Sequence, residues 1–138
     1  MIDPANVPAV AADETLARFA TQSSQYRPSD GSVKQDLFMP HPRRELSVMR
    51  HRNATIEDVW AVGRSVARAM DRSLHGRSDI SASACSVDGL AIVASPILPD
   101  NPNHADVIGW PESKEDKKAI AQKLAAAATK LIAPPGAN

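Results

Sequence analysis

The sequence predicts an α+β domain, with a small mixed or antiparallel sheet of about four strands packed by two main helices, plus a short N-terminal helix. Two long segments carry apolar residues at steps of three and four, which is the pattern of amphipathic helices. Several shorter segments are apolar or alternate apolar with polar residues, as strands do. The 138 residues suffice for one domain, assigned to residues 13–133 between tails at 1–12 and 134–138.

The N-terminal third is expected to contain little regular structure. Residues 1–12 hold two prolines and no apolar period, so we expect a flexible tail. Asp13 can cap a short helix over residues 14–22, because apolar side chains recur there on one helical face. Two prolines in residues 37–44 exclude a regular helix and a central strand, so this stretch is expected to be extended.

The clearest prediction is a strand followed by a helix. Residues 45–50 alternate as a strand does. Thr55 and Asp58 then form the pattern of a capping box, with aspartate in place of the usual glutamate. Trp60 and Gly63 lie on the apolar stripe of the helix that follows. A glycine costs helix stability, so close packing against a strand is the expected reason for Gly63.

Three further strands are predicted before the last helix. Residues 79–85 alternate, residues 90–94 are an apolar run, and the Asp88-Gly89 pair between them favours a hairpin. Residues 105–110 form the next strand. Because a helix separates the strand at 45–50 from the next one, a right-handed parallel crossover is a candidate topology. We expect antiparallel pairing of the later strands and both helices mainly on one face of the sheet.

The last helix begins after Ser113, which can act as its N-cap. Lysines lie on its outer side and small apolar residues on its inner side. Pro134 and Pro135 end it.

Charge is balanced overall but divided along the chain. Lysine plus arginine and aspartate plus glutamate are both 16, which disfavours a protein that binds nucleic acid over its whole surface. Residues 41–77 carry eight arginines and a net charge of +4. Residues 78–112 contain no lysine or arginine and carry −5. Solvated helix faces explain part of this division, and a binding surface is the functional alternative.

Cysteine usage and hydropathy point to a cytoplasmic protein. Cys85 is the one cysteine, so an intrachain disulfide and a zinc–thiolate cluster are both excluded. The first residues lack the basic start and apolar core of a secretory signal. No run approaches the roughly 18 apolar residues of a membrane span. We therefore expect no membrane partner.

The common signatures of enzymes and cofactor proteins are missing. There is no phosphate loop, dinucleotide fingerprint, nucleophile elbow or helical zinc motif. The four histidines are scattered along the chain, so we expect neither a metal site nor a cofactor.

The first candidate site is the arginine block. Arg43, Arg44 and Arg50 flank the strand at 45–50, and Arg77 leads into the next one. Arginine forms forked contacts that suit phosphate and carboxylate groups. The structural alternative is that these side chains pair with nearby carboxylates.

The second candidate site is the stretch before the strand at 105–110. Asn103, His104 and Asp106 lie where a loop meets a strand, a place that often carries binding residues. His104, oriented by Asp106, is a candidate acid or base, and Asn103 and His104 are candidate ligand contacts. Turn chemistry explains the same residues without any function.

The leading interpretation is a small non-catalytic binding or accessory domain. It holds an anionic partner, such as a nucleotide, an RNA backbone or an acidic protein surface, through the arginine and histidine cluster. One alternative is a small enzyme that acts on a nucleotide or phosphoester with His104 as acid and base. Another is a pure protein-interaction module, and a homo-oligomer is compatible with all three.

Overall fold

The computed structural model describes residues 7–40 and 45–136, and it confirms a mixed α+β architecture. Its main helices are α1 (Ile56–Ala69) and α3 (Lys114–Ala127), with a short α2 (Ala82–Cys85) and two 3-10 turns, Ser23–Gln25 and Gln35–Phe38. The described residues form five strands: β1 (Thr15–Ala20), β2 (Leu46–Arg50), β3 (Gly76–Ser81), β4 (Ala91–Ala94) and β5 (His104–Ile108).

The five strands form one sheet in the order β3-β1-β2-β5-β4, and every neighbouring pair is antiparallel. β2 and β3 run in the same direction on either side of α1, as the crossover pattern suggested. They are not paired with each other, because β1 lies between them and bonds to both. The sheet is therefore antiparallel rather than mixed.

The prediction of a helix over residues 14–22 is wrong, because this segment contains β1, an interior strand of the sheet between β3 and β2. Leu16 and Ala20 pack into the core on one face of the sheet, and Ala17 and Phe19 pack on the other. The sequence of a strand that is buried on both faces is a short apolar run rather than an alternation of apolar and polar residues. Hydrophobic periodicity alone cannot separate such a run from a short helix.

The strand predicted at 79–85 begins and ends earlier. β3 ends at Ser81, whose hydroxyl accepts a hydrogen bond from the backbone N–H of Ala84 and so caps α2. Asp88 and Gly89 do adopt positive φ angles. They do not join paired strands, because β3 and β4 lie at opposite edges of the sheet.

The caps predicted at Thr55 and Ser113 are confirmed, whereas Asp13 precedes a strand and caps no helix. The Thr55 hydroxyl accepts from the N–H of Asp58 at 3.1 Å, and the Asp58 carboxylate accepts from the N–H of Thr55 at 3.0 Å. Ser113 caps α3 by accepting from the N–H of Asp116 at 3.1 Å. These contacts satisfy backbone donors that the first turn of a helix leaves free.

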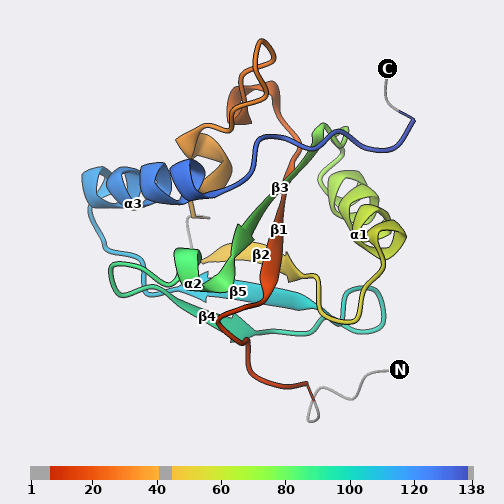
Figure 1. Ribbon diagram of the computed structural model, residues 1–138, viewed down its shortest axis with the longest axis horizontal. Coiled ribbons are helices and arrows are strands. Elements are labelled where there is room, and N and C mark those ends of the chain that lie inside the picture. Colours follow the sequence, from red (N-terminus) through yellow and green to blue (C-terminus); the bar gives the residue numbers. More distant parts are fainter. Residues whose placement is uncertain (1–6, 41–44, 137–138) are drawn as a thin grey trace.

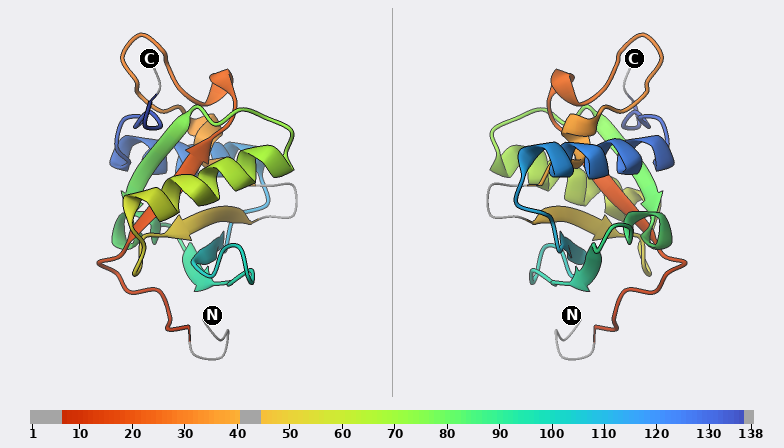
Figure 2. Two further views of the ribbon diagram at one scale, coloured as in Figure 1. Left: turned by 90° about the vertical axis from the view of Figure 1, so that its right-hand side faces the viewer. Right: turned by 90° about the vertical axis from the view of Figure 1, so that its left-hand side faces the viewer.

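The two main helices cover opposite faces of the sheet, which corrects the expectation of one covered face (Figures 1 and 2). The larger core lies on the α3 side and includes Leu124 of α3 with Val107 of β5. A smaller core lies on the α1 side, where Phe19 and Met49 meet Val59. The sheet is thus the middle of three layers.

Trp60 and Gly63 lie where the α1 pattern predicts. The Trp60 side chain is 2% exposed. A Cβ added at Gly63 would lie 2.7 Å from the Phe19 ring, so the helix approaches β1 too closely for a larger residue.

The outer edge of β3 is covered by the chain that follows α3. The N–H of Arg77 donates to the carbonyl of Ile132, and the N–H of Ile132 donates back to the carbonyl of Arg77. Thr129 adds backbone and side-chain hydrogen bonds to residues 78 and 79. This segment belongs to the sheet edge, and it precedes the tail assigned to 134–138.

Part of the segment assigned as an N-terminal tail contacts the domain. The carbonyls of Pro8 and Ala9 accept from Arg50, and that of Ala12 accepts from the N–H of Ser83. Among the described residues, no helix is both long enough and apolar enough to cross a membrane.

Candidate functional site

A cavity of about 110 Å³ lies on the α1 side of the sheet, between the C-terminal half of α1 and strands β1, β2 and β5. Its lining contains two arginines, a histidine and no acidic residue. The lining residues are Arg18, Phe19, Thr21, Gln25, Ser47, Val48, Met49, Val66, Met70, Arg72, Asn101 and His104.

Arg18 is one of the two arginines that line this cavity. Its position in β1 shares the alternation of Leu16 and Ala20, whose side chains pack on the α3 side, but β1 and β2 are paired only at Leu16 and Ala17. Arg18 borders the cavity beyond these paired positions. Nε donates to the carbonyl of Leu37 at 2.8 Å, and Nη1 donates to the carbonyl of Ser47 at 3.0 Å. Both partners are neutral, so Arg18 has no carboxylate partner among the residues that the structure describes.

The charge on Arg18 is not lost by burial. Desolvation lowers the pKa of Arg18 well below its ordinary value, to about 10. The group therefore stays protonated at neutral pH, although it is less well solvated than a surface arginine. An uncompensated, partly buried cation is costly unless a counter-charge is supplied.

Polar groups complete the wall around Arg18. Arg72 follows α1, and its Nη1 donates a long hydrogen bond of 3.5 Å to the Thr21 hydroxyl. The side chain of Asn101 is 9% exposed, and its Oδ1 has no hydrogen-bond partner.

His104 reaches the cavity from β5, where it pairs with Met49 of β2. Its Nδ1 lies 2.9 Å from the carbonyl oxygen of Ser95. A carbonyl only accepts, so Nδ1 carries the proton in this contact. Nε2 lies 3.8 Å from Asp106, too far for a hydrogen bond. In the neutral ring, Nε2 is therefore the basic nitrogen.

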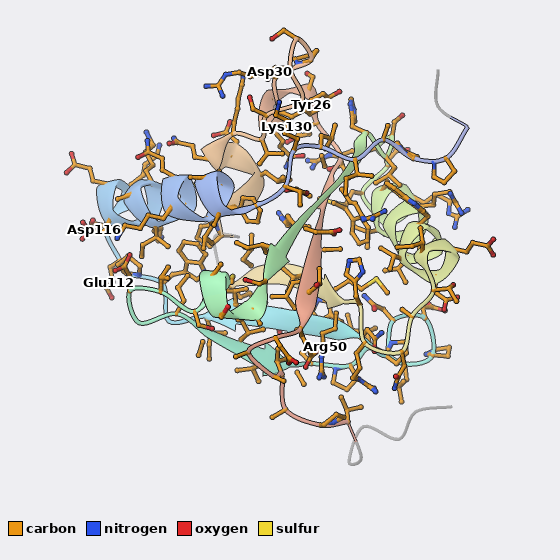
Figure 3. The ribbon with its side chains drawn as sticks, viewed as in Figure 1. Tyr26, Asp30, Arg50, Glu112, Asp116 and Lys130 are labelled. Atoms are coloured by element: carbon orange, nitrogen blue, oxygen red, sulfur yellow. The ribbon has the colours of Figure 1, made fainter. Side chains whose placement is uncertain are left out.

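Arg50 and His104 lie on different faces of the sheet, although their strands β2 and β5 are neighbours. Met49 and His104 share one face of the sheet, so Arg50 points to the other. Arg50 is fully buried, and both oxygens of Glu14 accept from its Nε and Nη2, at 2.7 and 2.8 Å. Figure 3 shows Arg50 at the end of the sheet next to the N-terminal segment. Its donors are occupied, and we do not assign it to the ligand.

Arg77 is also held by protein groups. Its guanidinium lies 4.7 Å from the centre of the Trp60 ring, and Nε donates to Asp79 at 3.2 Å. His51 Nε2 contacts the same carboxylate at 3.1 Å. This buried network accounts for Arg77 without a ligand.

Four predicted residues remain: Asn103, Arg43, Arg44 and Asp106. Asn103 is buried and lines a second cavity. Arg43 and Arg44 lie outside the described residues. Asp106 lies next to His104 but does not line the first cavity.

The two arginines of the cavity, Arg18 and Arg72, were not predicted as site residues. Arg18 fell within the segment interpreted as a helix, and Arg72 belongs to the basic segment that solvated helix faces explain in part. The available signal was the sequence TLARFA, in which a single arginine interrupts an apolar strand. A charge at the centre of such a run needs a specific partner.

Within residues 7–40 and 45–136, no three His, Cys, Asp or Glu side chains gather as a metal site would require. Comparisons with protein-family models, curated proteins and solved structures gave no match for this chain. The fold and the cavity together define a three-layered α+β domain with a cationic cavity under one helix.

Proposed function

We propose that this protein binds an anionic group in the cavity around Arg18. The observation that carries the proposal is the guanidinium of Arg18, which is partly buried, is protonated at neutral pH and bonds only to neutral carbonyls. An anion would supply the missing counter-charge. Arg72 and His104 would add charge and directed hydrogen bonds.

The size of the cavity narrows the ligand. A volume of 110 Å³ is about four times the roughly 30 Å³ that one water molecule occupies. Pockets for whole drug-sized ligands hold about 300–1,000 Å³. The cavity therefore suits a phosphate or carboxylate group, either free or at the end of a larger molecule that extends into solvent.

The test is a titration of the wild-type protein with phosphate, sulfate and acetate, followed by NMR. We expect binding that perturbs Arg18 and His104 and weakens as the salt concentration rises. Adenosine monophosphate and a short RNA form two further arms, which show whether the anionic group belongs to a nucleotide or a nucleic acid.

Variants separate the site from general positive charge. Arg18→Met should weaken binding at least tenfold, and His104→Gln should weaken it by less. Arg64→Met is the matched control, because Arg64 is exposed on α1 and does not line the cavity. If Arg18→Met does not fold, Arg72→Gln tests the same cavity. Equal weakening by Arg64→Met, or no anion binding by the wild type, would refute the proposal.

A second candidate function rests on His104. Its Nδ1 is held by Ser95, which leaves Nε2 as a base near the cationic cavity. This arrangement favours acid–base chemistry on a phosphoester. Turnover of p-nitrophenyl phosphate that is lost in His104→Gln would support an enzyme, whereas binding without turnover supports the non-catalytic domain.

A further inference from the structure

A second cavity, of about 290 Å³, lies beside the N-terminal half of α1. It is bounded by α1 on one side and by the loop that leads into β5 on the other. Its charged and amide side chains come from Arg52, Asn53, Asp58, Asp100 and Asn103. Met49 lines this cavity and the first one, so the two are neighbours.

Arg52 contributes donors without acceptors. Its Nε and Nη2 are buried and have no hydrogen-bond partner. Glu14 is close enough for the charge of Arg52 to help lower the pKa of that carboxyl. Both carboxylate oxygens of Glu14, however, accept from Arg50. Arg52, which lines the cavity, therefore keeps two donors that no protein group uses.

Asn103 contributes an acceptor without a donor. The residue is 5% exposed, and its Oδ1 has no partner. Its Nδ2 donates to the backbone carbonyl of Arg52 at 2.6 Å, which fixes the orientation of the amide. If the amide oxygen and nitrogen of Asn103 exchanged places, the amide oxygen would face the carbonyl oxygen of Arg52, and two acceptors would meet. The fold therefore leaves Oδ1 of Asn103 without a donor.

Unpartnered groups of this kind are rare because they are costly. Each buried polar atom without a partner costs about 1–3 kcal/mol. Here three such atoms lie on two residues that are bonded to each other and line one cavity. A ligand that satisfies them must offer an acceptor to Arg52 and a donor to Asn103.

The carboxylates at the cavity determine the charge of that donor. Asp58 and Asp100 both line the cavity. They favour a cationic donor over a neutral one. A carboxylate for Arg52 and an ammonium group for Asn103 and the two aspartates occur together on a free α-amino acid. The volume lies just below the roughly 300 Å³ at which drug-sized pockets begin, which suits one such molecule.

We propose that this second cavity is a binding site for a free α-amino acid. The carboxylate of the ligand bonds to the guanidinium of Arg52. Its ammonium group bonds to Oδ1 of Asn103 and faces Asp58 and Asp100. The site is separate from the anion cavity, and neither proposal depends on the other.

The experiment is a titration of the full-length wild-type protein with each of the twenty amino acids, followed through the Arg52 Nε–H signal in NMR spectra. We expect one or more amino acids to shift this signal in a saturable way. Acetate offers only the carboxylate and glycine methyl ester only the ammonium group. Each should bind at least tenfold more weakly than the best amino acid. Acetamide, which is uncharged, should be weaker as well.

Variants test the residues directly. Arg52→Gln and Asn103→Ser should each weaken amino-acid binding at least tenfold, with thermal melts to verify folding. Arg64→Gln is the matched control, because Arg64 is exposed on α1 and lines neither cavity. Arg18→Met should leave amino-acid binding unchanged, which separates this site from the anion cavity.

Three results would overturn the proposal. The first is that no amino acid shifts the Arg52 signal of the wild type. The second is that acetate or acetamide binds as tightly as the best amino acid. The third is that a folded Arg52→Gln protein binds as the wild type does. If the variants do not fold, the wild-type titrations still decide between these outcomes.

Discussion

At the scale of single residues, the pair Arg50 and Glu14 shows how one buried charge organises the start of the domain. Arg50 is inaccessible to solvent, and the side chain of Glu14 is 14% exposed. The guanidinium also donates to the carbonyls of Pro8 and Ala9, so it ties the N-terminal segment to β2. Removing one member would leave the other buried without compensation.

We predict that Glu14→Gln lowers the free energy of unfolding by about 3 kcal/mol at pH 7. Arg50 holds the pKa of Glu14 below its ordinary value of 4.5. A lowered carboxyl pKa stabilises the fold above the unfolded-state pKa, and this contribution is lost as pH falls through the folded-state value. Urea unfolding at pH 7 and pH 3 should therefore show a difference between wild type and variant that shrinks at pH 3. Asp13→Asn is the exposed control, and a constant difference would contradict the mechanism.

Cys85 gives a second prediction at this scale. The thiol is buried, and burial raises its pKa to about 11. Since the thiolate is the reactive form, the native protein at pH 8 should react with a disulfide reagent at least roughly a hundredfold more slowly than free cysteine. Reaction in strong denaturant should be immediate. Rapid reaction of the native protein would place the thiol at the surface.

At the scale of elements, α1 depends on a close approach to β1. Gly63 lies on the buried face of the helix against Phe19, which is itself buried. The glycine lowers helix propensity by about 1 kcal/mol relative to alanine. The fold accepts this loss because the helix can then approach the sheet closely.

We predict that Gly63→Ala destabilises the protein by about 1 kcal/mol, although alanine favours helix. Overpacking of a core costs about 1–3 kcal/mol, which exceeds the propensity gain. Chemical denaturation is the measurement. Ser65→Ala is the matched control, because Ser65 is exposed on the same helix and should change stability by less than about 0.5 kcal/mol. Stabilisation by Gly63→Ala would show that the Phe19 ring yields easily.

At the scale of the whole molecule, the chain after α3 covers the β3 edge of the sheet. The edge of β3 is covered by residues 129–132 through five hydrogen bonds with residues 77–79. Leu131 of the same segment also packs against the larger core. The chain after α3 therefore completes the sheet and protects an edge that could otherwise pair with another molecule.

We predict that truncation after Ala128 lowers the free energy of unfolding by about 3–5 kcal/mol, since each lost hydrogen bond contributes about 1 kcal/mol net. The exposed edge of β3 should also promote self-association, which light scattering detects. Truncation after Ala133 keeps the covering segment and should change neither property. Equal stability of the two truncated proteins would show that the segment does not protect the edge.

The parts of the fold that follow from local rules could be predicted. Thr55 and Ser113 mark the starts of α1 and α3 because a cap acts on backbone groups three residues away. β1 could not be identified, since its apolar residues face both sides of the sheet, and hydrophobic period alone does not separate such an interior strand from a short helix. The edge positions of β3 and β4 also depend on contacts across the whole chain.

The candidate site was predictable only in part. His104, which was predicted as a ligand contact from its place at a loop-to-strand junction, lines the cavity. The arginines were harder to sort. Arg50 and Arg18 look alike in the sequence, but one meets a carboxylate 36 residues away and the other meets only carbonyls.

The sequence by itself determined the α+β class, the two main helices and their caps, because hydrophobic period and capping operate within a few residues. The tertiary structure alone decided the interior place of β1 between β3 and β2 and the distribution of the helices over both faces. It also decided which arginine lacks a carboxylate partner among the described residues. These features depend on which distant residues meet when the strands pair. A strand pairing places every side chain on one face or the other, and thereby decides which charges are neutralised and which remain for a ligand.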